Sequence, residues 1–184
     1  MAETLVIIVL LGLAVWAVVI FNRLVRDRNR TRAGWSDIDV QLQRRHDLIP
    51  RLVQAVRAYA DYERATLTAV TELRRRSEET DRPAAKARLE DELARGIDRL
   101  VAVAESYPDL KADRNFLDLQ EQLVDTEDKL QYARRFYNGA VRDLNTRIQS
   151  FPDLIVARSL GFREAEYFDA EAGTEAAPAV RLSP

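Results

Sequence analysis

The residues of this chain that could do acid–base or metal chemistry are carboxylates, with a single histidine among them. His46 is the only histidine and cysteine is absent, so disulfides, thiolate metal sites and cysteine nucleophiles are excluded. A di-metal site inside a helical bundle needs Glu-x-x-His pairs, and His46 stands in no such pair. We interpret His46 as a surface residue at a helix end, without a functional role.

Two carboxylates, Glu63 and Glu127, fall among the apolar positions of their segments and are candidates for buried polar sites. One hypothesis is a metal-dependent enzyme whose ligands are these carboxylates. We favour pairing with an arginine, for instance Arg57 or Arg134, that fixes helix register. Glycines occur singly and no serine has a plausible histidine partner, so neither a phosphate loop nor a Ser-His-Asp arrangement is expected. The sequence predicts no catalytic, metal-binding or cofactor-binding residue, and no small-molecule substrate.

Helices must position these groups, because the chain has only six glycines and six prolines in 184 residues. A sheet would need turn residues far more often. The composition, with 47% hydrophobic and 32% charged residues and a net charge of -2, is typical of a folded chain. Such a charge balance gives no reason to expect nucleic-acid binding.

An uncharged apolar run, Leu5–Phe21, lies near the start of the chain. It spans roughly 26 Å, and Leu24 and Val25 extend it to the roughly 30 Å of a bilayer core. A cleavable signal peptide is the alternative, but the usual basic n-region and small-residue cleavage pattern are missing. We predict a short extracytoplasmic N-terminus at residues 1–4 and a single-pass transmembrane helix at residues 5–25.

Basic residues cluster after the apolar run, against one acidic residue, Asp27, whereas Glu3 is the charged residue before it. The positive-inside rule therefore places the N-terminus outside and the remainder in the cytoplasm. The arginines either contact anionic headgroups, at about 1 kcal/mol each, or only set the topology. The predicted membrane-surface cluster consists of Arg23, Arg26, Arg28, Arg30 and Arg32.

The first apolar block after the anchor has helical spacing and is expected to end near His46. Asp47 can then cap a new helix that has Pro50 in its first turn, where the missing N–H costs least. The apolar residues of this block are Trp35, Ile38 and Leu42.

The next two blocks cover residues 49–73 and 89–107, with the polar segment 77–83 as the turn between them. Pro108 ends the third block, and Asp113 is the expected N-cap of the fourth helix.

The fourth block has apolar residues seven apart, which is typical of a coiled-coil seam on a helix of some 38 residues, about 57 Å long. Pro152 is expected to end this helix. Asn138 and Asn145 flank the seam, either as a polar ladder for recognition or, more commonly, as a solvated flank. The seam residues are Phe116, Leu123, Leu130, Tyr137, Leu144 and Phe151, with Leu119, Thr126, Ala133 and Ala140 between them.

A helix of that length cannot cover its own apolar stripe, and short connections make sequential helices antiparallel neighbours. The predicted fold is all-α: one N-terminal transmembrane helix, followed over residues 26–168 by a four-helix antiparallel, up-and-down bundle with a long final helix. The first bundle helix is expected to continue out of the anchor without a break. Residues 169–184 are expected to be disordered. The apolar residues after Pro152 are expected to pack back on the bundle: Leu154, Ile155, Leu160, Phe162 and Phe168.

Several ordered motifs resemble the LemA family of bacterial membrane proteins. They are the stretches Arg28–Val53 and Tyr107–Leu123, the Tyr137-Asn138 pair, Phe151-Pro152 and Gly161-Phe162. The resemblance implies a four-helix bundle behind one transmembrane helix at a bacterial inner membrane, N-terminus outside, and it implies no reaction. His46 departs from the family pattern, in which an aromatic is usual. The motif residues expected to be structural are Trp35, Ile38, Leu42, Asp47, Pro50, Tyr107, Pro108, Asp109, Phe116, Tyr137, Asn138, Phe151, Pro152, Gly161 and Phe162.

We therefore expect a membrane-anchored, non-enzymatic helical scaffold or adaptor that binds protein partners or copies of itself at the membrane surface. The resemblance also implies a link to membrane organelles, since some relatives act in organelle formation in magnetic bacteria. A carboxylate-based metal-dependent enzyme, and a sensory or anionic-lipid-binding module, are the alternatives.

Overall fold

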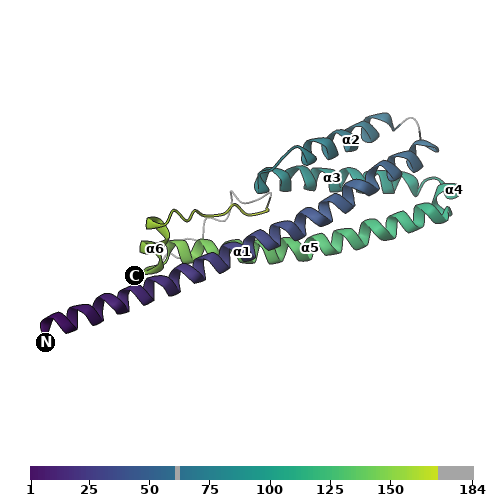
Figure 1. Ribbon diagram of the computed structural model, residues 1–184. Helices are drawn as coiled ribbons and strands as arrows, with labels where there is room; N and C mark the ends of the chain where they lie inside the picture. The colour runs from purple at the N-terminus through teal and green to yellow at the C-terminus, as the bar shows by residue number, and fades with distance from the viewer. Residues whose placement is uncertain (61–62, 170–184) are drawn as a thin grey trace, which may run out of the picture. The chain divides into compact units, whose positions relative to one another are not determined.

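The computed structural model describes residues 1–60 and 63–169, and within these residues the chain is all-helical, without a strand. The predicted all-α class is confirmed. The predicted disordered tail, residues 169–184, lies outside the described residues except for its first residue. Figure 1 shows the helices α1 (Ala2–Arg57), α2 (Arg64–Glu78), α3 (Pro83–Ala104), α4 (Pro108–Lys111), α5 (Arg114–Gln149) and α6 (Asp153–Ser159).

The chain divides into two compact units, which we describe separately. The anchor unit comprises residues 1–37 and 133–165, and the main unit comprises residues 38–132 together with the described residues from 166 onward. Helices α1 and α5 each contribute residues to both units. The boundaries expected from the sequence, at residues 25 and 168, stay predictions.

Helix α1 is continuous over 56 residues, so the expected continuation from the apolar run into the following helix is confirmed. The expected break at Asp47 and Pro50 is wrong, because Pro50 lies inside α1. Proline removes one helical hydrogen bond, but Ile49 and Leu52 are 1% and 0% exposed and hold the helix on either side of it. Asp47 caps no helix: its carboxylate accepts a hydrogen bond from Gln43 Nε2 at 3.1 Å.

The apolar block over residues 49–73 is divided between α1 and α2 instead of forming one helix. Glu63 stands directly before α2, so it is not on a helical stripe. The turn expected over residues 77–83 is shorter, because Ser77 and Glu78 still belong to α2. Pro83 is the first residue of α3, a position where its missing N–H costs least.

In the main unit, α1, α2, α3, α4 and α5 all contribute side chains to an apolar core. Within this unit α2 and α3 pack along each other. Asp113 caps α5 as expected, since its Oδ1 accepts a hydrogen bond from the backbone N–H of Phe116 at 3.1 Å. The core members with 0% exposure are Leu52, Val56, Ala60, Leu93, Leu100 and Ala104.

The long seam predicted for α5 is confirmed over most of its length. Its members from Phe116 to Leu144 are at most 9% exposed. The final member, Phe151, was assigned wrongly, because it lies beyond the end of α5 and is 81% exposed. The Phe151-Pro152 peptide bond is cis, and Pro152 directly precedes α6.

The anchor unit has a smaller apolar core, in which Ile20 and Leu24 of α1 pack with Leu144 and Ile148 of α5 and with α6. The expectation that the residues after Pro152 pack back is correct for Phe168, which is fully buried, and for Phe162, which packs against this core. The expectation is wrong for two other apolar residues, since about half of their surface is exposed to solvent. These are Ile155 and Leu160, both 55% exposed.

Among the described residues, α1 is the helix long and apolar enough to cross a membrane, judged by length and composition. Only 6% of its most apolar window is buried, and side chains from Leu5 through Val19 are exposed around the whole circumference, apart from the partly covered Ala17. A core helix would be mostly buried, so the exposure fits the predicted anchor.

Candidate functional site

A buried carboxylate, Glu90 on α3, is the centre of a polar cluster in the main unit. Its side chain is 1% exposed and accepts hydrogen bonds from three others. Arg45 Nη1 lies 3.3 Å from Oε2, His46 Nε2 lies 2.7 Å from Oε1, and the Ser77 hydroxyl donates to Oε1. Because these donors come from α1 and α2, one side chain of α3 connects three helices.

The cluster extends to a fourth helix through Arg45. Its Nη2 donates to Glu127 on α5, and Glu127 also accepts from Gln131 Nε2 at 2.6 Å. We call Arg45, His46, Ser77, Glu90 and Glu127 the Glu90 cluster.

Glu90 is held in its ionised form. Burial alone raises the pKa of this carboxyl, but the hydrogen bonds and charges of His46, Ser77 and Arg45 outweigh burial and hold the pKa below its ordinary value of 4.5. An ionised carboxylate only accepts hydrogen bonds, so His46 Nε2 carries the hydrogen in this contact.

The expectation that His46 is a surface residue at a helix end is wrong. It is 2% exposed and lies within α1. The reason is that α1 does not end there and that Glu90 offers the ring a buried acceptor.

A signal for this cluster was present in the sequence. Arg45 stands three residues after Leu42 and four before Ile49, and Glu90 stands three residues before Leu93. Both are therefore at the spacing of buried positions. Counting only apolar residues hides such positions.

The two carboxylates singled out from the sequence have different surroundings. Glu127 pairs with an arginine as favoured, here Arg45, and its side chain is 38% exposed. Glu63 is half-buried, and its Oε2 accepts a hydrogen bond from Thr66 Oγ1 at 3.4 Å. Over residues 1–60 and 63–169, no three His, Asp or Glu side chains are grouped so as to hold a metal ion.

The Glu90 cluster lacks the contacts of a nucleophile. The Ser77 hydroxyl donates to Glu90, whose lowered pKa makes the carboxylate a poor base for the serine proton. Ser77 is 0% exposed, so a substrate has no direct access. The arrangement connects four helices of the main unit, and fixing helix register is the best-attested role of buried ionic groups.

The anchor unit has an ion cluster of its own around Arg147 on α5. Arg147 Nε lies 2.5 Å from Asp27 Oδ2 on α1, and Nη1 lies 3.1 Å from Asp153 Oδ2 on α6. The hydrogen bond to Asp27 is the main cause that raises the pKa of Arg147 above its usual range. We call these three residues the Arg147 cluster, and it connects the three helices of this unit.

The five arginines of the predicted membrane-surface cluster are all exposed. Asp27 does not offset their charge, because it is buried and paired with Arg147. Arg30 approaches Asp143 to 3.9 Å, but both side chains are about half exposed, and such pairs contribute little. The segment therefore presents a net positive surface directly after the apolar run.

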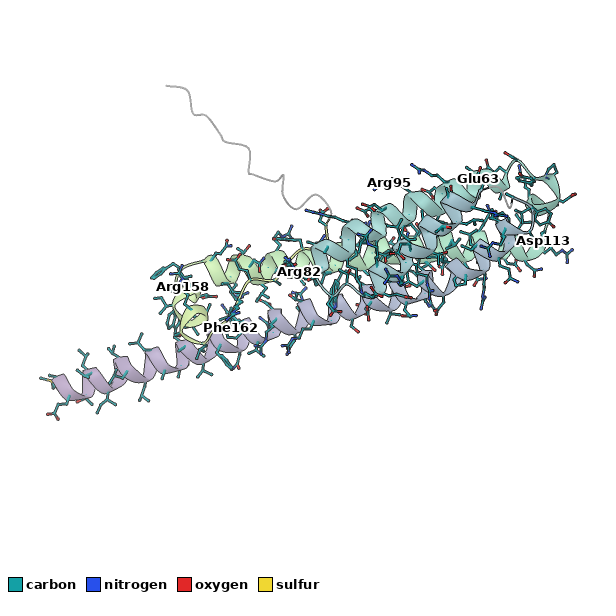
Figure 2. The ribbon with its side chains drawn as sticks, turned by 90° about the horizontal axis from the view of Figure 1, so that it is seen from above. Glu63, Arg82, Arg95, Asp113, Arg158 and Phe162 are labelled. Carbon is teal, nitrogen blue, oxygen red and sulfur yellow. The ribbon has the colours of Figure 1, made fainter. Side chains whose placement is uncertain are left out.

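The Gly161-Phe162 motif has a clear local role. Gly161 has a φ of 71°, which favours glycine, and it ends α6 in a turn in which the Phe162 N–H donates to the Ala157 carbonyl at 3.0 Å. The turn places the Phe162 ring 6.1 Å from that of Phe21 and 5.1 Å from Arg28 Cζ. Figure 2 shows Phe162 beside α1, with Arg158 on the same corner.

Asn145 is 8% exposed, so the interpretation as a solvated flank is wrong for it. Its side-chain amide donates to the Ala165 carbonyl at 3.0 Å and accepts from the Ala165 N–H at 2.9 Å. This pair holds the segment after α6 against α5. Asn138 is half-buried.

Several other motif residues lie in ring contacts, in buried positions or at the start of a helix. Trp35 and Tyr137 are 5.5 Å apart between ring centroids, and Ile38, Leu42 and Phe116 are buried. Three consecutive motif residues form the start of α4: Tyr107 is the N-cap, Pro108 is the first residue and Asp109 is the acidic residue of the first turn.

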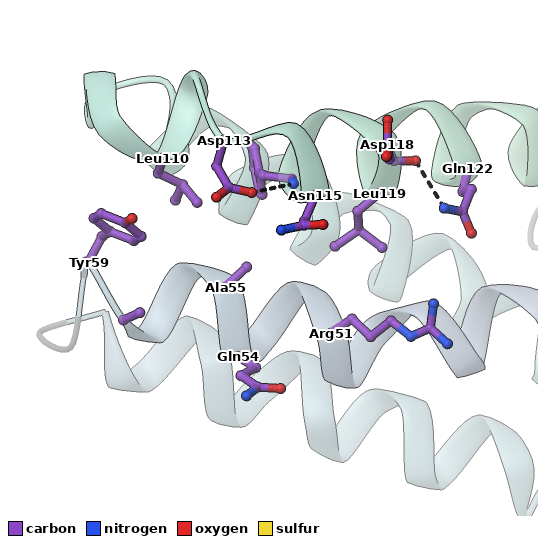
Figure 3. Close-up of a pocket in the computed structure, with 12 residues that line it drawn as sticks. Arg51, Gln54, Ala55, Tyr59, Leu110, Asp113, Asn115, Asp118, Leu119 and Gln122 are labelled. Carbon is purple, nitrogen blue, oxygen red and sulfur yellow. Dashed lines mark hydrogen bonds between the residues drawn. The ribbon is translucent and has the colours of Figure 1, made fainter.

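The open grooves on the main unit include two that α5 helps to line. One, of about 580 Å³, is lined by the end of α1 and by α4 and α5, with Arg51, Tyr59 and Asn115 among its residues. Figure 3 shows that its lining mixes polar and apolar side chains. The other, of about 530 Å³, lies between α3 and α5. It has an apolar floor with the buried Ile97 and Leu123, and an acidic rim of Asp98, Glu127 and Asp128.

Comparison with known proteins assigns the family. The model of the LemA family matches residues 34–182. The chain belongs to the LemA family. Its LemA relatives include "Protein LemA" of Metamycoplasma hominis, which is 26% identical over 150 residues, covering 81% of this chain and 68% of the relative.

Two further relatives are "Magnetosome protein MamQ 2" of Paramagnetospirillum magneticum, 27% identical, and "Magnetosome protein MamQ" of Magnetospirillum gryphiswaldense, 25% identical. In both cases 80% of this chain is covered, and the chain spans 64% of the relative's length. The LemA resemblance inferred from the motifs is thus confirmed.

Proposed function

We propose that this LemA-family chain is a single-pass, membrane-anchored scaffold or adaptor, without an enzymatic reaction of its own, that binds protein partners or further copies of itself at the membrane surface. The observation that carries the proposal is the continuity of α1. One unbroken helix contains both the exposed apolar run from Leu5 and the buried core residues Ile49 and Leu52. A folded helical unit is thereby attached to a candidate membrane span without a flexible linker.

The charge distribution supports an orientation with the N-terminus outside and the main unit in the cytoplasm of a bacterium. Five exposed arginines follow the apolar run, and the acidic residue among them is neutralised by Arg147. The positive-inside rule favours this side for the arginines. A four-helix, up-and-down arrangement of the cytoplasmic helices is part of the proposal.

The groove between α3 and α5 is the surface we assign to a protein partner. Its apolar floor and the exposed Asp98 and Asp128 on its acidic rim fit an apolar segment flanked by basic residues, whereas Glu127 is already paired with Arg45. Two relatives are named magnetosome proteins, which supports, for this chain, a role in organising a membrane rather than in metabolism.

Photo-cross-linking in native membranes tests this function. A benzophenone amino acid at Val124 lies in the groove, whereas the same probe at Leu117 lies on α5 outside the groove lining, and both positions are exposed. We expect one defined adduct, with a partner or a second copy, from position 124 and none from position 117. Monomer alone from both positions, or equal adducts from both, would overturn the proposal.

A further inference from the structure

We propose that the corner between α5 and α6, residues 150–160, is a second membrane-contacting element, whose apolar side chains enter the lipid interface beside the α1 span. We call it the α6 corner. The inference rests on the proposed membrane anchor, and its partner is a bilayer surface that contains anionic lipid.

The first observation is the exposure of three large apolar side chains on this short segment. Phe151 is 81% exposed, and Ile155 and Leu160 are each 55% exposed. The neighbouring Val156 and Ala157 are buried against the core of the anchor unit. The segment is therefore fixed by one face while the other presents apolar surface, an arrangement that marks a contact with another phase or molecule.

The second observation is the level along α1 at which this corner packs. α6 belongs to the same core as Ile20 and Leu24, near the end of the apolar run. The part of the run before this core, Leu5–Val19, is 15 residues long and about 22 Å in length, whereas a hydrocarbon core is about 30 Å thick.

About five more residues are needed to complete the span, which takes it to the level of Leu24. The α6 corner lies at that level, since its buried face contacts Ile20 and Leu24. Its exposed apolar face then meets lipid instead of water.

The third observation is the charge around the corner. Arg23, Arg26 and Arg28 of α1 and Arg158 of α6 are all exposed. The carboxylates Asp27 and Asp153 are engaged by Arg147 inside the unit. Among the described residues after α6, the exposed carboxylates are Glu164, Glu166 and Asp169, of which Glu166 is paired with Arg82. Apolar side chains bordered by arginines match a lipid interface with anionic headgroups.

Site-directed spin labelling provides the test, since the natural chain has no cysteine. Full-length Ile155→Cys and Phe151→Cys proteins carry a nitroxide in mixed vesicles of phosphatidylcholine and phosphatidylglycerol. Accessibility to oxygen, which partitions into lipid, is compared with accessibility to a water-soluble nickel chelate. We expect oxygen to be favoured at both sites.

Two further labels make the outcome unambiguous. Leu10→Cys lies in the apolar run and reports on the anchor itself. Phe136→Cys is an exposed apolar site of the same unit, and it packs beside Gly34, ten residues or about 15 Å beyond Leu24; we expect the nickel chelate to be favoured there.

The outcomes separate the two claims. Lipid exposure at residue 10 with water exposure at residues 151 and 155 overturns the corner and leaves the anchor intact. Water exposure at residue 10 overturns the proposed function as well. If residues 136 and 155 give the same ratio, no local insertion occurs and the inference is wrong.

Discussion

Each unit of the chain has an ion cluster centred on one charged side chain, and the two central groups have opposite signs. In the main unit the centre is a carboxylate, Glu90, surrounded by donors from α1 and α2. In the anchor unit the centre is a guanidinium, Arg147, held between Asp27 and Asp153. Both clusters connect three or more helices, so both set helix alignment.

The difference between the clusters is their access to water. The side chain of Glu90 is 1% exposed, whereas that of Arg147 is 27% exposed. Removing a partner in the main unit leaves buried groups that water cannot reach, whereas Arg147 can recover part of its hydration. Similar ion clusters in one chain therefore differ in how much unfolding free energy is lost when one partner is removed, and the more buried cluster is expected to lose more.

The largest effect is expected from Glu90→Leu. The substitution leaves the buried ring of His46 without its Glu90 acceptor and the buried guanidinium of Arg45 with Glu127 as its remaining partner. We expect a loss of about 3–5 kcal/mol in unfolding free energy. Thermal unfolding of the full-length protein in detergent micelles measures it, and hydrogen exchange locates the loss in α2 and α3. Glu92→Leu, on the exposed face of the same helix, is the matched control, and we expect its unfolding free energy to equal that of the natural chain. Equal losses in the two variants would refute a special role for Glu90.

Asp27→Asn is expected to cost less, about 1–3 kcal/mol, because Arg147 keeps Asp153 and some contact with water. Exchange should accelerate in α6 and at the end of α5, while the amides of α2 and α3 stay as they were. Asp143→Asn, at an exposed pair, serves as the comparison. A loss as large as that of Glu90→Leu would contradict the argument from burial.

Acid is expected to destabilise the folded chain by protonating the Glu90 carboxylate. Its folded-state pKa is below the ordinary value of 4.5, so the unfolded chain binds the proton more readily. The stabilisation is complete above that value and is lost as the pH falls through the lower folded-state pKa. Unfolding midpoints measured from neutral pH downward should fall more steeply for the natural chain than for Glu90→Leu. Parallel profiles would show that Glu90 does not carry the acid sensitivity.

The smallest changes in unfolding free energy are expected from alanine substitutions of two glycines in the anchor unit, Gly34 and Gly139. A Cβ on Gly34 would lie 3.0 Å from the Cα of Tyr137, a backbone atom that yields little, whereas a Cβ on Gly139 meets nothing within 4 Å. We expect Gly139→Ala to stabilise by about 0.5–1 kcal/mol through helix propensity. Gly34→Ala should destabilise by about 1 kcal/mol or more through overpacking. Thermal unfolding midpoints of the two variants measure these changes. A higher midpoint in both variants would show that α1 and α5 are not closely packed at Gly34.

Much of the fold was predictable because it depends on apolar spacing. The seven-residue period from Phe116 to Leu144, the continuity of α1 beyond the apolar run and the Asp113 cap all follow from local patterns. The break at Pro50 was predicted wrongly, because tertiary burial of Ile49 and Leu52 outweighs the local effect of one proline.

The candidate site was the part least accessible to sequence reasoning. Glu90 is 44 residues from His46 along the chain, and nothing local to either one indicates the pairing. Asp27 looked like a counter-charge to the arginines, yet it is three residues after Leu24 on the buried face of α1 and pairs with Arg147, 120 residues away. Extending the 3–4 spacing back from Ile38 through Gly34 would have predicted its burial.

The spacing of buried residues on α1 also has a consequence for how the family can vary in length. Before Ala17 the helix is exposed on all sides, so a residue inserted there only lengthens the span. From Ile20 onward one face is committed to α5 and α6, and each inserted residue turns that face by about 100°. A single insertion between Leu24 and Asp27 would carry Asp27 away from Arg147, and only a change close to a whole number of turns, such as about seven residues, would restore its phase. We therefore expect length differences between related chains to gather before Ala17 and to be absent between Ile20 and Gly34.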